Sequence, residues 1–124
     1  IDVVIYTALG PDDSSIESTK DQLIKTGGKS TDTSKLLGEQ LGKISKEVIK
    51  NTNIRRLLVA GGDTSGYVTK NLEIMAMEMI KPITPGAPLC KTYSTNSIYD
   101  GLEITLKGGQ MGSTDFFVKV KNLT

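Results

Sequence analysis

The chain has 124 residues, of which 37% are hydrophobic and 23% charged, values typical of one soluble globular domain. Its 15 basic and 14 acidic side chains are mixed along the chain and give a net charge of +1, which argues against a nucleic-acid or membrane-surface partner. No apolar run approaches the roughly 18 residues of a membrane-spanning helix, and no signal-peptide pattern opens the chain.

Two residue types limit the chemistry. The chain has no histidine, which excludes Ser–His and Cys–His hydrolase sites and most zinc sites. Any metal is therefore expected to be a hard cation held by carboxylates, hydroxyls and substrate phosphates. The lone Cys90 cannot form an internal disulfide, which predicts a reducing cytoplasm and favours a buried structural thiol over a nucleophile.

The N-terminal part predicts a strand and a helix. The apolar run Val3–Tyr6 predicts a buried strand, and because the chain starts almost inside it, we expect that a longer polypeptide was cut here. Capping residues at Asp12, Asp13 and Ser14 then predict a helix that ends at Gly27–Gly28.

A second helix is predicted after the capping residues of 31–34. Leu37, Leu41, Ile44 and Val48 recur at steps of four, three and four, so they are expected to form its buried face. The asparagines of 51–53 are expected to end this helix.

The stretch 57–66 is where we expect the chemistry. Leu57–Ala60 predicts a strand of a parallel sheet, followed by a glycine pair and by possible helix caps at Asp63, Thr64 and Ser65 for a helix over 64–72. Such a turn presents unpaired backbone N–H groups and the positive end of a helix dipole, which favours phosphate. From this stretch alone, an ordinary capped turn fits as well.

The next segment predicts a strand over Ile74–Ile80. Its methionines at alternate positions (Met75, Met77 and Met79) are expected to pack against a helix. The proline-rich run 85–88 predicts an irregular connection before the strand that begins at Leu89.

The segment 102–107 alternates Leu102, Ile104 and Leu106 with polar residues, as in a half-exposed strand that pairs with the segment 89–93. We therefore expect an α/β fold with a mixed, largely parallel sheet flanked by helices on both faces.

A second glycine-rich turn spans 107–112 and leads through capping residues into a closing helix whose apolar side is Phe116, Phe117 and Val120. Two such turns favour a phosphate-bearing ligand bound between them. We expect the strands 57–60 and 102–107 to end side by side, because ligands of open α/β sheets gather at the carboxyl ends of strands.

Three motifs, GGDTSG (61–66), PGAP (85–88) and KGGQMGSTDFF (107–117), resemble in order and spacing the GGETSG, PGVP and KSGNFG…DFF signatures of the four-carbon acid sugar kinases. The resemblance is to the nucleotide-binding C-terminal domain of these enzymes and covers most of the chain.

This resemblance implies an ATP-dependent kinase of sugar acids such as threonate, erythronate or their 3-oxo relatives, with Mg²⁺ as the companion cation. It implies that an N-terminal domain holds the sugar acid while this domain holds ATP or ADP. The residues it assigns to the nucleotide are Gly61, Gly62, Asp63, Thr64, Ser65, Gly109 and Gly112. No catalytic base is assigned, because it is expected on the other domain.

The chain departs from the family pattern at three points. Asp63 replaces a common Glu, Gly108 and Met111 replace Ser and Phe, and the sugar-acid domain with an upstream Ser-containing ATP-binding loop is missing. We therefore expect residues 1–124 to be a C-terminal fragment, or one half of a two-chain enzyme, inactive alone and able to form homo-oligomers. The alternatives are a non-catalytic nucleotide- or anion-binding regulatory module and a purely structural domain.

Overall fold

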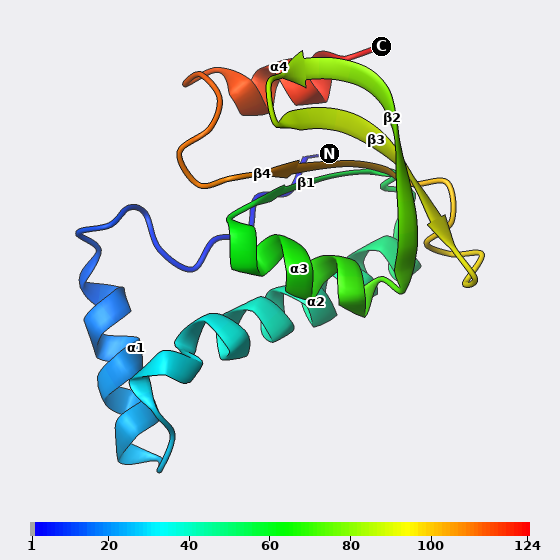
Figure 1. Cartoon of the computed structure of the whole chain (residues 1–124). Coiled ribbons are helices and arrows are strands. Elements are labelled where there is room, and N and C mark those ends of the chain that lie inside the picture. Colours follow the sequence, from blue (N-terminus) through cyan, green and yellow to red (C-terminus); the bar gives the residue numbers. More distant parts are fainter. Residues whose placement is uncertain (1) are drawn as a thin grey trace.

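A computed structural model describes residues 2–124 as one mixed sheet packed with helices (Figure 1). The helices are α1 (Ser14–Lys25), the short 3-10 helix η1 (Ser30–Asp32), α2 (Thr33–Asn51), α3 (Gly62–Asn71) and α4 (Phe116–Asn122). The strands are β1 (Arg56–Ala60), β2 (Ile74–Thr84), β3 (Ala87–Ser94) and β4 (Glu103–Lys107).

The sheet has the strand order β1-β4-β3-β2, and only β1 and β4 run parallel. The prediction of a mixed sheet is confirmed, but the prediction that it is largely parallel is wrong. The reason lies in the proline-rich run, because only Pro85 and Gly86 form a turn and both flanking residues belong to strands. A two-residue turn with Gly86 at φ +79° joins β2 and β3 as an antiparallel hairpin.

The two N-terminal helices form as predicted. Asp13 caps α1 by accepting a hydrogen bond from the Ser15 amide at 2.9 Å, and no residue of α1 is buried. In α2, however, the buried positions are Gly38, Gly42 and Ile49, whereas Ile44 is 41% exposed. The face of α2 that packs against α3 is therefore the one that carries the glycines, whose lack of a side chain lets α3 approach closely. It is not the face defined by the four aliphatic side chains.

Two apolar clusters lie on opposite faces of β1. Leu57 and Val59 pack in the larger cluster, with buried residues of α2 and α3, whereas Leu58 packs with Phe116 and Val120 of α4. In Figure 1, α2 and α3 lie below the sheet and α4 lies above it. The short α4 covers only part of its face, so the prediction that helices flank both faces of the sheet is not confirmed.

The prediction of a half-exposed strand over 102–107 is wrong. Leu102, Ile104 and Leu106 do share the face toward the larger cluster, but Thr105 is completely buried and Lys107 is 9% exposed on the other face. β4 is a central strand between β1 and β3, so its polar side is covered as well.

Arg56 anchors α4 to the sheet. Its guanidinium pairs with Glu103 at 2.5 Å and donates to the carbonyls of Val120 and Leu123 at 2.8 and 2.6 Å. A cation that satisfies the last carbonyls of a helix stabilises its C-terminus. The loop before β4 is held in a similar way, because Arg55 donates to the carbonyls of Ile98 and Asp100.

Val3–Tyr6 is not a strand, contrary to prediction, and its side chains are 46–69% exposed. Within residues 2–124, β1 pairs only with β4, so the outer edge of β1 carries no partner. An extended apolar segment becomes a strand only with a neighbouring ladder, and this segment has none.

The methionine prediction is also wrong. Met75, Met77 and Met79 are 74%, 44% and 63% exposed, because they lie on the edge strand β2. In Figure 1 the β2–β3 hairpin curves away from α2 and α3. The edge position also explains why β2 tolerates Pro82, which cannot donate to a ladder.

Cys90 lies partly buried in β3 and packs against the larger cluster. Burial raises the pKa of its thiol, which disfavours the thiolate and agrees with a structural role. Across residues 2–124, no helix is long and apolar enough to cross a membrane.

The α2–α3 contact can be tested at Gly38. An added Cβ would lie 2.3 Å from the Tyr67 ring, so Gly38→Ala is expected to lower the free energy of unfolding by about 1–3 kcal/mol. Gly66 of α3 has open space beside it, so Gly66→Ala is expected to raise that free energy by about 0.5–1 kcal/mol. Urea unfolding measures both, and equal stability of the two variants would contradict the packing described.

Candidate functional site

The two glycine turns begin at paired residues. Ala60 at the end of β1 lies opposite Lys107 at the end of β4, and the Gly61 amide donates to the Lys107 carbonyl at 2.9 Å. Figure 1 shows both connections leaving the sheet at the same end, at the left of the view. The prediction that these two strands end side by side is therefore confirmed. The region where the two turns lie next to each other is the candidate site.

The first turn depends on Gly61. Its φ of +112° is a conformation that side chains rarely allow, and it lets α3 begin directly at Gly62. The predicted helix start and caps are wrong by a few residues, because Asp63, Thr64 and Ser65 lie inside the first turn of α3. The Ser65 amide and hydroxyl both donate to the Gly61 carbonyl, at 2.9 and 2.7 Å.

The helix start leaves donors free. No side chain caps α3, and among residues 2–124 no acceptor lies in hydrogen-bond range of the amides of Gly62, Asp63 and Thr64. Gly62 and Asp63 are exposed, and a Cβ built on Gly62 meets no atom within 4 Å. Three unpaired amides at the positive end of a ten-residue helix, with open space before them, suit an anionic ligand.

The second turn differs from the first. α4 begins only at Phe116, has Asp115 as its N-cap residue and is seven residues long, so the prediction that the turn leads through capping residues into a closing helix is confirmed. Phe116 and Val120 are buried as expected, whereas Phe117 is 48% exposed. Gly109 is exposed with open space around it, whereas Gly112 has φ +86° and packs against Phe116, whose ring an added Cβ would approach to 2.8 Å. Gly109 can therefore face a ligand, while Gly112 shapes the turn.

Behind Gly112, Ser113, Asp115 and Lys119 form a small polar cluster. Ser113 donates to Asp115, and Lys119 contacts Asp115 at 3.0 Å and Ser113 at 3.1 Å. The hydrogen bond from Ser113, supported by Lys119, lowers the pKa of the Asp115 carboxyl. This cluster satisfies its own charges and so serves the turn rather than a ligand.

Lys107 is a residue of this site that the sequence-based assignment missed. Its ammonium donates to the carbonyls of Gly108 and Gly109, each at 3.0 Å, and thus braces the second turn. Its position as the first residue of the third motif could have indicated a role in the site. The alternation along 102–107, however, predicted that its side chain is exposed.

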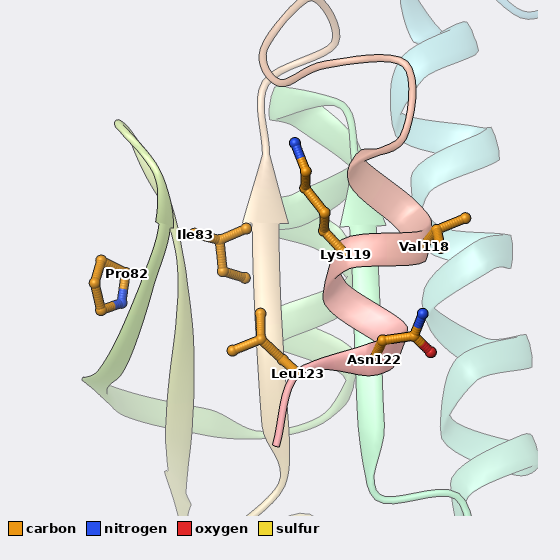
Figure 2. Close-up of a pocket in the computed structure, with 6 residues that line it drawn as sticks. All are labelled: Pro82, Ile83, Val118, Lys119, Asn122 and Leu123. Atoms are coloured by element: carbon orange, nitrogen blue, oxygen red, sulfur yellow. The ribbon is translucent and has the colours of Figure 1, made fainter.

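A hollow of about 330 Å³ lies at the second turn, within the size range of small-ligand sites. Its walls include Lys107, Gly109, Ser113, Thr114 and the Phe116 ring. A larger hollow of about 440 Å³ lies elsewhere, between α4 and the end of β2 (Figure 2). Because its walls are largely apolar and include neither glycine turn, it is a weaker candidate.

The chain offers few ligands for a metal. Within residues 2–124 no three Cys, Asp or Glu side chains cluster, and Asp63 is the carboxylate of the first turn. Mg²⁺ commonly binds through one or two carboxylates together with substrate phosphates, so this donor set fits Mg²⁺ only as the companion of a bound phosphate.

Comparison with known proteins matches this geometry to a family. The profile of the nucleotide-binding C-terminal domain matches residues 1–117. The 3-oxo-isoapionate kinase of Paraburkholderia graminis is 36% identical over 121 residues, which cover 98% of this chain and 26% of the kinase. The 3-oxo-tetronate kinase of Pseudomonas savastanoi pv. phaseolicola is 31% identical over 118 residues, 94% of this chain and 24% of the kinase.

Solved structures share the fold. A Haemophilus influenzae protein aligns with a TM-score of 0.63 at 23% identity, covering 93% of this chain and 25% of its own. A Bordetella bronchiseptica protein, crystallised with citrate as a domain-swapped dimer, aligns with a TM-score of 0.61 at 21% identity, covering 66% of this chain and 20% of its own. At these identities the likeness establishes the fold alone.

The first turn is tested by Gly62→Val. Because the new side chain meets nothing in the protein, the melting temperature is expected to stay near wild type, while calorimetric affinity for Mg·ATP falls at least tenfold through steric exclusion. Gly10→Val, which also projects into open space, is the matched control and should leave affinity unchanged. Undiminished binding by the Gly62 variant would contradict the role of this turn.

The second turn is tested by comparing Gly109→Val with Gly112→Val. The first is expected to weaken Mg·ATP binding at near wild-type stability, and the second to lower the melting temperature as well, because it strains φ and collides with Phe116. Equal thermal stability of both variants would show that Gly112 does not shape the turn as described.

Proposed function

The chain belongs to the nucleotide-binding C-terminal domain family of the four-carbon acid sugar kinases, and from this premise we propose that it binds ATP at its two glycine turns. The observation that carries the proposal is the pairing of β1 with β4, which brings the free amides of α3 beside the second turn. The proposed contacts are Gly61, Gly62, Asp63, Thr64 and Ser65 in the first turn and Gly109 in the second, whereas Gly112, which was also expected to contact the nucleotide, holds the shape of the second turn.

The chain spans about a quarter of the length of the curated relatives it matches. Its relatives are named as kinases of 3-oxo-tetronate and 3-oxo-isoapionate, so we place this domain in an enzyme that phosphorylates a short sugar acid. Binding of the acid and the catalytic base are assigned to a second domain, as the resemblance to the sugar-acid kinases implies, and no base is assigned among the residues of the two turns.

Phosphoryl transfer needs positioning and charge neutralisation more than covalent chemistry from the protein. Bound Mg·ATP would supply the phosphoryl group and a cation that offsets its charge. The amides of Gly62, Asp63 and Thr64 would donate to phosphate oxygens, and the exposed Asp63 carboxylate could take part in holding the cation. The residues of the second turn would flank the nucleotide and limit the entry of water.

We also propose that the protein is cytoplasmic and that it self-associates. A cytoplasmic setting agrees with the unpaired thiol of Cys90 and with the use of ATP. Self-association is supported by the exposed methionines of the edge strand β2, which leave an apolar surface without a partner in residues 2–124.

Calorimetry of the 124-residue chain with Mg·ATP tests the proposal. We expect binding at one site per chain, with modest affinity because the site is completed by a second domain, and no phosphorylation of 3-oxo-tetronate or threonate by the chain alone. Robust turnover would show that the proposed division of labour is wrong.

The nucleotide titration, together with an assay of phosphorylation, distinguishes the two alternative functions. A regulatory module would bind nucleotide but would fail to restore phosphorylation when supplied with the sugar-acid domain of the Paraburkholderia relative. A purely structural domain would bind neither Mg·ATP nor Mg·ADP at millimolar concentration.

A further inference from the structure

Lys107 is a largely buried residue whose ammonium has no carboxylate partner among residues 2–124. Only 9% of the residue is exposed, and within residues 2–124 no Asp or Glu oxygen lies within ion-pair distance of it. Four other lysines form ion pairs at the surface, at positions 20, 46, 119 and 121. A buried charge is costly unless it is paired, so Lys107 requires an explanation beyond bracing a turn.

Its hydrogen bonds are incomplete. An ammonium has three donors, and the carbonyls of Gly108 and Gly109 take two of them. The side chain also lines the hollow of the second turn, whose walls contain no acidic residue. The remaining donor and the uncompensated charge therefore favour an anion in that hollow.

Lys107 also joins the two turns. Its carbonyl accepts from the Gly61 amide at 2.9 Å, so its backbone is fixed against the start of α3 while its side chain holds the second turn. The side chain of Lys107 points to the α4 face of the sheet and α3 packs on the other face, but both the ammonium and the free amides of Gly62 to Thr64 lie at the same end of the sheet. A chain of phosphates, unlike a single small anion, can extend across that end.

We propose that Lys107 binds a phosphate group of the nucleotide through its remaining N–H, with the carbonyls of Gly108 and Gly109 orienting the ammonium. The proposal rests on the proposed nucleotide-binding function. It assigns a different role to each half of the site, since the first turn binds phosphate through neutral amides and the second through one full charge.

The test uses Lys107→Gln, which keeps a donor for the glycine carbonyls but removes the charge, and Lys107→Arg, which keeps the charge. Lys70→Gln, at the exposed last turn of α3, removes the same charge far from the turns and is the matched control. Calorimetry with Mg·ATP, tripolyphosphate and adenosine is run on each variant and on wild type, at two salt concentrations.

We expect Lys107→Gln to weaken Mg·ATP and tripolyphosphate about tenfold or more, to leave adenosine affinity unchanged, and to reduce the salt dependence of phosphate binding. Lys107→Arg should bind tripolyphosphate more tightly than the Gln variant, and Lys70→Gln should match wild type. A purely structural brace would weaken adenosine and Mg·ATP by the same factor, which would overturn the proposal.

The same measurements also distinguish the role of Lys107 from nucleotide binding itself. If wild type binds Mg·ATP and Lys107→Gln binds it equally well, the role of Lys107 is wrong while nucleotide binding stands. If wild type binds none of the three ligands, nucleotide binding by this chain fails, and the phosphate role of Lys107 fails with it.

Discussion

The parallel pairing of β1 with β4 is the constraint on which the site depends. It aligns Ala60 with Lys107, and the hydrogen bond from the Gly61 amide to the Lys107 carbonyl extends this alignment into the turns. Without this pairing, the free amides of α3 and the second glycine turn would belong to unrelated parts of the surface. The antiparallel β2–β3 hairpin encloses β4 on its other side, and its turn at Gly86 packs against Met111 of the second glycine turn.

The two turns offer different kinds of hydrogen-bond donor to the proposed site. At the first, glycine allows a positive φ and an immediate helix start, so the proposed ligand would meet backbone amides. At the second, α4 starts only at Phe116 and is short, and in our proposal the ammonium of Lys107 takes the place of free helix amides. Such a division suits a polyphosphate, whose successive groups can each meet a different kind of donor.

Local sequence signals predicted the parts that local physics determines. The strand, glycine pair and helix of 57–71 were predicted in order, as were the helices near 14–25 and 33–51. Long-range pairing was not predictable, and it decides which strands are at the edge. Met75, Met77 and Met79 have the alternation of a packed strand but lie on edge strand β2, whereas Lys107 has the pattern of an exposed residue but lies on a central strand. The close contact of α2 with α3 at Gly38 was also not predicted, because hydrophobic periodicity detects apolar side chains and gives no signal at a glycine.

Amide chemical shifts of ¹⁵N-labelled protein during a titration with Mg·ATP test the shared site most directly. We expect the amides of Gly62 to Thr64 and of Gly108 to Gly112 to shift together, with one dissociation constant, while those of residues 52–55, which precede β1 at its opposite end, stay in place. Shifts confined to one of the two turns, or two separate dissociation constants, would contradict a single nucleotide held between them.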